Sequence, residues 1–145
     1  MTPEEVLQAI PQQEPFRFID EVLELGDDHI VASTTFRPDA DFYRGHFPGN
    51  PITPGVLLLE TMAQAGVVAH GIYLLGSDPD RPRMLTLFTD ATVEFNGVVR
   101  PGQRVITRGK KLVFRRLFLR SAVEMTLEDG TVVCSGTLAG MGVPA

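Results

Sequence analysis

Residues 56–75 form a nearly unbroken apolar segment, and this segment limits most strongly what the chain can fold into. Thr53 and Pro54 stand just before it as a helix cap and a first helical residue. Because almost every face of the resulting helix is apolar, we expect it to be buried on most sides. Its length approaches that of a membrane span, but polar residues interrupt it, which favours the core helix of a soluble domain. These residues are Glu60, Gln64 and His70.

Segments of alternating or β-branched composition predict about six strands around this helix. The expected strands are residues 18–25, 30–36, 85–95, 104–113, 116–127 and 131–140. Turns are expected at residues 26–28 and 128–130, and a short N-terminal helix over residues 2–10, capped by Thr2. One buried helix and about six strands predict an α+β domain in which a curved antiparallel sheet wraps the helix.

Length and composition limit the class of protein. A chain of 145 residues, 43% hydrophobic, suits one domain over residues 1–145 with its own core. The single Cys134 excludes an internal disulfide, and no His or Cys cluster has metal-ligand spacing, so we expect no metal and no cofactor. The N-terminus lacks the basic and then apolar pattern of a signal peptide, which predicts a cytoplasmic location.

Charge is distributed unevenly along the chain. Between Phe95 and Val123 there are eight basic residues and no acidic one. Such a run is either a solvated sheet face or a docking surface for an acidic partner. Nucleic acid is disfavoured as that partner, because the chain carries a net charge of −5 and has no RNA-binding aromatic motif. The basic residues are Arg100, Arg104, Arg108, Lys110, Lys111, Arg115, Arg116 and Arg120.

The segment Arg44–Gly55 carries three prolines and three glycines in twelve residues, so we expect a rigid loop rather than a helix or a central strand. His46 lies in this loop. It is either an ordinary surface residue or a base, since imidazole titrates near neutral pH. Gly55 ends the loop at the helix N-terminus, where its N–H would favour developing negative charge and its missing side chain would admit a substrate.

Glu60 interrupts the apolar helix, where an unpartnered carboxylate would be costly. It is either a structural residue with a polar partner or a member of an internal site that raises its pKa. Gln64, one turn later, could hold its carboxyl group. A base, an acid and a backbone donor within fifteen residues suit proton abstraction beside a thioester carbonyl. The chain has no Gly-x-Ser-x-Gly elbow, phosphate loop or dinucleotide fingerprint.

Residues 15–20 (PFRFID), 45–55 (GHFPGNPITPG) and 59–66 (LETMAQAG) resemble the FabZ-type 3-hydroxyacyl-[acyl-carrier-protein] dehydratases of bacterial type II fatty-acid synthesis. A weaker similarity covers residues 88–95 and 99–102. The resemblance implies a hotdog fold, a homodimer that often forms a trimer of dimers, and a substrate carried by acyl carrier protein. It also implies that His46 of one subunit faces Glu60 of the other.

Carried over residue by residue, His46 resembles the catalytic base, Glu60 the catalytic acid, Gly55 the donor to the thioester carbonyl, and Gln64 the residue that orients the carboxyl group. Glu at position 60 with Val56 resembles the dehydratase branch rather than the bifunctional dehydratase/isomerase branch. Four residues are candidates for the lining of an acyl tunnel, although each also suits a plain core: Phe47, Leu58, Met62 and Phe88.

Four of the basic residues are candidates for docking the carrier protein: Arg100, Arg104, Arg115 and Arg116. The chain departs from the usual pattern of the family at Glu21, at residues 96–98 and at Gln103, near where the family meets its carrier. The identity of the carrier therefore stays open, between fatty-acid synthesis and a polyketide or aryl-polyene pathway.

The expected activity is dehydration of (3R)-hydroxyacyl thioesters to trans-2-enoyl thioesters. Two alternatives remain: a hotdog thioesterase, and a non-catalytic protein that binds acyl thioesters. The second is disfavoured because binding alone requires neither His46 nor Glu60.

Overall fold

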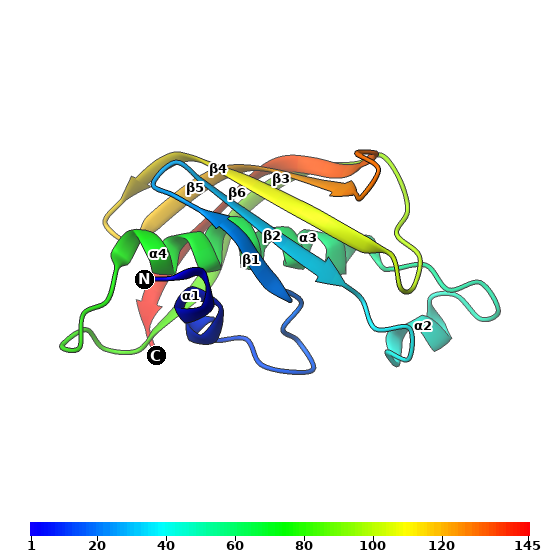
Figure 1. Ribbon diagram of the computed structural model, residues 1–145, viewed down its shortest axis with the longest axis horizontal. Helices are drawn as coiled ribbons and strands as arrows, with labels where there is room; N and C mark the ends of the chain where they lie inside the picture. Colours follow the sequence, from blue (N-terminus) through cyan, green and yellow to red (C-terminus); the bar gives the residue numbers. More distant parts are fainter.

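The computed structural model describes residues 1–145. Six strands form one sheet in the order β1-β2-β4-β5-β6-β3, and every neighbouring pair is antiparallel. The sheet curves over one long helix, and a short helix, α1 (Pro3–Ala9), lies beside β1 (Figure 1). The predicted α+β architecture is confirmed. The strands are β1 (Glu21–Leu25), β2 (His29–Thr35), β3 (Met84–Phe95), β4 (Arg104–Arg115), β5 (Phe118–Leu127) and β6 (Val132–Pro144).

The central helix runs through three consecutive elements, α3 (Gly55–Ala63), η1 (Gln64–Ala69) and α4 (His70–Leu75). Residues 61–70 are all buried, as the apolar composition predicts. By length and a mean hydropathy of 1.3, the 21 residues Gly55–Leu75 could cross a membrane. However, 61% of the most hydropathic window is buried inside the domain, which is the position of a core helix.

The middle of this helix, η1, is π-helical, which the sequence analysis does not anticipate. Here the helix approaches the sheet closely. A Cβ atom added at Gly66 would lie 2.6 Å from Cγ2 of Val123, and one added at Gly109 would lie 3.0 Å from Cα of Gly66. Ser121 of β5 donates a hydrogen bond of 2.9 Å from its hydroxyl group to the Gly66 carbonyl oxygen. The two glycines therefore permit the contact between helix and sheet.

The start of the helix differs from the prediction. Pro54, not Thr53, is the N-cap residue, and Gly55 is the first helical residue. The Thr53 side chain is buried and shares a hydrogen bond of 2.6 Å with the Tyr43 hydroxyl group, so it is not available as a cap. The expected loop also begins later than residue 44, because the short helix α2 (Phe42–Gly45) includes its first two residues.

Several strand boundaries also differ from the prediction. The strands expected to end at residues 113 and 140 continue to Arg115 and Pro144. The strand expected at residue 116 begins at Phe118, because Arg116 and Leu117 form the turn between β4 and β5 with φ angles of 53° and 69°. The strand expected at residue 18 begins at Glu21. The N-terminal helix forms as predicted, with a reciprocal capping box between Thr2 and Glu5.

Strand β3 lies at the edge of the sheet and pairs only with β6, which leaves its other edge without a partner over 12 residues. Most of its side chains are exposed on both faces, including Leu87 and Phe88 at 55% and 47%. Val56, at the start of α3, is 71% exposed. A long, apolar, unpaired edge is a surface to which a further strand can add.

Candidate active site

His46 directly follows α2, in a loop that closes on itself. The His46 carbonyl oxygen accepts a hydrogen bond of 2.9 Å from the Ile52 N–H group, and Phe47 and Asn50 exchange two backbone hydrogen bonds. The loop is also attached to the segment before β4. Thr53 N–H donates to the Val99 carbonyl oxygen at 2.8 Å, and Arg100 Nη1 donates to Asn50 Oδ1 at 3.4 Å. The loop is therefore a fixed support for His46, as its prolines and glycines predict.

The His46 ring is held in one tautomer. Its Nδ1 lies 2.8 Å from the Ile52 carbonyl oxygen. Because a carbonyl oxygen only accepts hydrogen bonds, Nδ1 carries a proton, and in the neutral ring the lone pair is therefore on Nε2. The ring also stacks on Phe47, with the two centroids 4.1 Å apart. A neutral imidazole with a fixed ring and a free Nε2 has the geometry of a general base.

Glu60 and Gln64 form a hydrogen-bonded pair on the central helix, as predicted. Gln64 is fully buried, and its Nε2 donates to Glu60 Oε2 at 3.0 Å and to the Phe16 carbonyl oxygen at 2.8 Å. Its Oε1 accepts from the Phe18 N–H group at 2.9 Å. The amide group is thus fixed by the backbone of residues 16–18, and it fixes the carboxyl group in turn.

Burial raises the pKa of the Glu60 carboxyl group above its ordinary value, and the hydrogen bond from Gln64 offsets part of this rise. Desolvation disfavours the ionised form of a carboxyl group, so the environment favours the protonated acid. A carboxyl group kept protonated closer to neutral pH is suited to donate a proton. Of the two alternatives left open by the sequence, a polar partner and an internal position that raises the pKa, Glu60 has both.

Gly55 presents a backbone donor at the start of the central helix. As the first helical residue it has no acceptor within the helix, and its N–H group makes no hydrogen bond elsewhere in the chain. A Cβ atom at this position would approach Cε1 of Phe95 to 3.3 Å. Glycine therefore allows Phe95 to pack beside the donor and leaves the N–H group free for a ligand.

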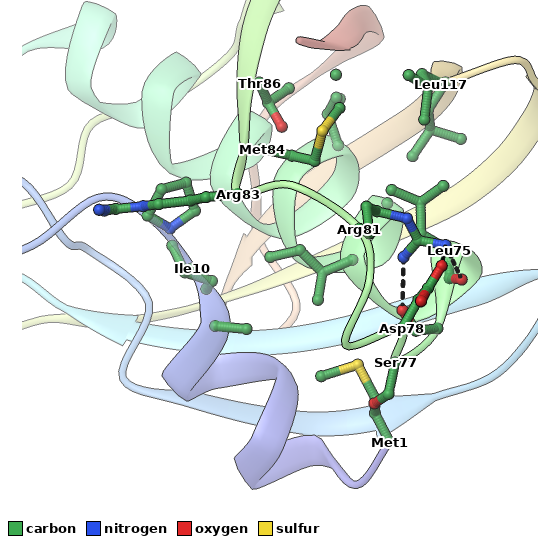
Figure 2. A pocket seen from close by; sticks show the side chains of 18 of the residues that line it. Met1, Ile10, Leu75, Ser77, Asp78, Arg81, Arg83, Met84, Thr86 and Leu117 are labelled. Atoms are coloured by element: carbon green, nitrogen blue, oxygen red, sulfur yellow. Dashed lines mark hydrogen bonds and ion pairs between the residues drawn. The ribbon is translucent and has the colours of Figure 1, made fainter. Parts of the chain in front are cut away.

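Two cavities adjoin the central helix. The smaller, of about 30 Å³, lies beside Glu60 and is also lined by Gln12 and Phe88. The larger, of about 420 Å³, lies at the α4 end of the helix, where Figure 2 shows Met84, Thr86 and Leu117 around it. Three residues line both cavities, so they adjoin each other: Val67, Thr86 and Gly140.

The structure divides the candidates for the acyl tunnel. Phe88 lines the smaller cavity. Leu58 and Met62 belong to the main hydrophobic core and line neither cavity, so for these two the core interpretation applies. Gln12 lines the smaller cavity and was missed by the sequence analysis. An isolated polar residue in an irregular N-terminal segment gives no local signal of such a position.

His46 lines neither cavity. It follows α2, which lies beyond the end of the central helix, whereas Glu60 lies on the helix itself (Figure 1). A single chain therefore places Glu60 and Gln12 at one cavity, with Gln64 bonded to Glu60, and presents His46 on a separate loop.

The other candidate groups have structural surroundings. Burial raises the pKa of the Cys134 thiol to about 12, and the sulfur atom contacts Met62 and Met125 in the core, so Cys134 is not a nucleophile. His70 is buried and donates from Nε2 to the Gly26 carbonyl oxygen at 2.8 Å. No group of three or more His, Cys, Asp or Glu side chains is arranged to hold a metal ion.

The four candidates for docking the carrier protein lie in two pairs, one before and at the start of β4 and one at its end. Arg100 adjoins the His46 loop, and Arg104 begins β4, where it pairs with Glu128 at 3.4 Å. Arg115 and Arg116 lie at the opposite end of β4, in and beside the turn to β5. Neither of these two side chains has an acidic partner, whereas Arg120 binds Asp90 at 3.0 Å. The turn therefore presents two free cations.

The architecture is the hotdog fold, in which an antiparallel sheet wraps a long central helix. Among solved structures, the chain is similar to the dehydratase heterocomplex ApeI:P from Xenorhabdus doucetiae, with a TM-score of 0.76 and 21% identity, over 99% of this chain and 92% of that one. It is also similar to a thioesterase from Haemophilus influenzae, with a TM-score of 0.70 and 17% identity, over 99% and 92%. These likenesses show the fold but not the reaction.

The sequence comparisons show the family. Residues 10–139 match the FabA-like domain, and the chain belongs to this dehydratase family. It is 33% identical over 135 residues to the 3-hydroxyacyl-[acyl-carrier-protein] dehydratase FabZ of Streptococcus pyogenes, covering 92% of this chain and 93% of the relative. It is 30% identical over 134 residues to the FabZ of Lactococcus lactis, covering 92% and 90%.

Proposed function

We propose that this protein dehydrates (3R)-hydroxyacyl thioesters of acyl carrier protein to trans-2-enoyl thioesters. The observation that carries the proposal is the buried Glu60 carboxyl group, which Gln64 orients at 3.0 Å and whose pKa is raised by burial. Such a group donates a proton to a leaving hydroxyl group, which a thioester hydrolase does not require. The FabZ relatives support the same substrate class.

In the proposed dehydration, His46, Gly55 and Glu60 have separate roles. His46 Nε2 takes the α-proton, and the Gly55 N–H group stabilises the enolate-like oxygen of the thioester carbonyl. Protonated Glu60 gives its proton to the β-hydroxyl group, the Cβ–O bond breaks, and water leaves as the Cα–Cβ double bond forms. A proton then returns from His46 to Glu60, directly or through solvent. No cofactor takes part in this scheme.

The site is completed by a second copy of the chain in this proposal. His46 of one subunit faces Glu60 of the other, in a homodimer formed along the unpaired edge of β3. Supporting observations are the apolar exposure of Leu87 and Phe88 on that edge and the position of His46 outside both cavities. Val56, beside Gly55, would then be covered. A trimer of such dimers is the higher assembly that we infer.

The acyl chain would run from Glu60 past Phe88 and Thr86 into the larger cavity. Its volume of about 420 Å³ falls in the range of small-molecule sites. Apolar side chains from α4, β3 and the β4–β5 turn line its wall, including Leu75, Met84 and Leu117. Phe47, stacked on His46, would cover the reacting end of the substrate in the opposite subunit.

The carrier protein would dock on basic residues at both ends of the sheet. Arg115 and Arg116 are free cations on the β4–β5 turn, Arg100 bonds to the His46 loop, and Arg104 begins β4. In a dimer that pairs β3 edges in antiparallel fashion, opposite ends of two subunits come together. We infer a cytoplasmic, single-domain enzyme of type II fatty-acid synthesis or of a related polyketide or aryl-polyene pathway.

The second candidate function is thioester hydrolysis, because a thioesterase shares the fold. One assay separates the two: 3-hydroxyacyl thioesters of graded length are supplied, and enoyl absorbance and free thiol are both recorded. We expect enoyl product without thiol release. His46→Ala and Glu60→Gln should each lower turnover by about 100-fold or more, the usual contribution of a general acid or base. Thiol release in step with substrate loss would refute the proposal, as would binding without any conversion.

A further inference from the structure

The cavity beside Glu60 has the size of a single water molecule. Its volume is about 30 Å³, and a cavity of this size with polar groups in its wall is sufficient for one ordered water. Half of the residues in its wall are hydrophobic, namely Ala63, Val67, Val68 and Phe88. Gln12 and Glu60 supply polar groups with both acceptor and donor capacity. The cavity thus adjoins the carboxyl group that, in the proposed function, makes water from the substrate.

Gln12 has an unsatisfied polar atom at this place. Its Oε1 is buried and has no hydrogen-bond partner in the chain. The backbone around it is fixed, because Arg17 donates from Nε to the Gln12 carbonyl oxygen at 2.9 Å and from Nη2 to the Ile10 carbonyl oxygen at 2.6 Å. A buried amide oxygen without a donor is unfavourable, and native structures rarely keep one without a ligand or water that satisfies it.

We propose that Gln12 Oε1 accepts a hydrogen bond from the β-hydroxyl group of the substrate and then from the water that this group becomes. This inference rests on the proposed function. While the hydroxyl group donates to Gln12, a lone pair of its oxygen is directed to the protonated Glu60 carboxyl group. After the Glu60 proton has moved and the Cβ–O bond has broken, the new water donates one hydrogen bond to Gln12 and the other to the Glu60 carboxylate.

The same contact has a role in the reverse direction. When an enoyl thioester is hydrated, the attacking water must lie beside the β-carbon with a lone pair directed to it. Gln12 and Glu60, as two acceptors, orient both O–H bonds of that water away from the carbon. Gln12 is therefore a substrate-contacting residue for both directions of the reaction, distinct from the base and the acid.

Gln12→Met tests the proposal, because methionine has a similar length but lacks the amide acceptor. We expect kcat for dehydration to fall about tenfold, as for the loss of one hydrogen bond in the transition state. The affinity for a saturated acyl thioester without a β-hydroxyl group should not fall. Tm should not fall either, since the substitution removes an unsatisfied buried oxygen. A high-resolution structure of the wild-type enzyme should contain a water bonded to Gln12, and the variant should lack it.

Three results would overturn the inference. They are a kcat of Gln12→Met within twofold of the wild-type value, an equal loss of affinity for the saturated analogue, or a wild-type cavity without water. A lower Tm would instead assign Gln12 a structural role. The outcome is separable from the proposed function: if the wild-type enzyme converts no hydroxyacyl thioester, the proposed function fails, whereas an active enzyme unaffected by Gln12→Met contradicts only this inference.

Discussion

At the scale of single residues, Glu60 shows how a group suited to chemistry lowers the stability of its own fold. Its pKa is raised by burial, so the folded state binds the carboxyl proton more tightly than the unfolded state does. Linkage then requires the free energy of unfolding to fall as pH rises from the unfolded pKa through the folded pKa. Above the folded pKa the fold therefore carries the full destabilisation of an ionised, partly buried carboxylate.

Glu60→Gln should remove this destabilisation, because the amide is neutral at every pH and its oxygen can still accept from Gln64 Nε2. We expect a Tm at pH 7 that is about 2 °C or more above wild type, since 1 kcal/mol corresponds to roughly 2–4 °C in a domain of this size. The difference should shrink as pH falls through the raised folded pKa and should vanish below about 4, where both side chains are neutral in the folded and the unfolded state. Thermal melts from pH 3.5 to 8 measure it, and parallel curves for the two proteins would contradict it.

At the scale of elements, the close approach of the central helix to the sheet depends on Gly66. Gly66→Ala would place a Cβ atom 2.6 Å from Val123 Cγ2, so helix and sheet must separate or repack. We expect a loss of about 1–3 kcal/mol in the free energy of unfolding, the usual cost of overpacking. Denaturant titration measures it.

Gly71→Ala is the matched control on the same helix, because its Cβ atom would meet only Leu119 at 3.8 Å. It should be neutral or stabilising by up to about 1 kcal/mol through helix propensity. Equal losses for the two variants would show that the packing at Gly66 is not the cause.

The β4–β5 turn is a second element in which local stability is lowered. Arg116 has a φ of 53°, a conformation that asparagine adopts more readily than arginine. Arg116→Asn should therefore raise the free energy of unfolding by about 0.5–1 kcal/mol.

If the turn docks the carrier protein, the same variant raises KM for carrier-linked substrate but not for a pantetheine-linked surrogate. A KM unchanged for both substrates would remove this turn from the docking surface.

These elements also show what sequence can predict here. Local composition predicts two elements well. The prolines and glycines of residues 44–55 predict the loop before the helix, and the apolar residues 56–75 predict the buried helix. The π-helical segment and the turn at Arg116 and Leu117 were not predicted. Gly66, in that segment, accepts a hydrogen bond from Ser121, which is 55 residues away, and the position of the turn follows from the register of β4 with β5. Gln64 was predicted to hold Glu60. Its bonds to Phe16 and Phe18, 48 and 46 residues away, have no local signal.

At the scale of the whole molecule, a single chain contains the residues of the proposed site but does not bring them together. Glu60 lies beside a cavity on the central helix, and His46 lies on a loop that lines neither of the two cavities described. Of the two edge strands of the sheet, β3 is the longer, with 12 residues against 5 in β1, and its free edge is one that a second copy could cover. A two-fold symmetric pair of chains would form two equivalent sites, each with His46 from one chain and Glu60 from the other.

Mixing two inactive variants tests this assembly directly. His46→Ala and Glu60→Gln homodimers each lack one group in both sites. After subunit exchange, half of the dimers are mixed, and each mixed dimer has one site with His46 and Glu60 both intact. We therefore expect the mixture to recover about a quarter of wild-type turnover, as two-fold symmetry requires. Recovery should follow the rate of subunit exchange, and chemical cross-linking before mixing should prevent it. If both groups instead acted within one chain, no dimer in the mixture would contain an intact site and turnover would stay absent.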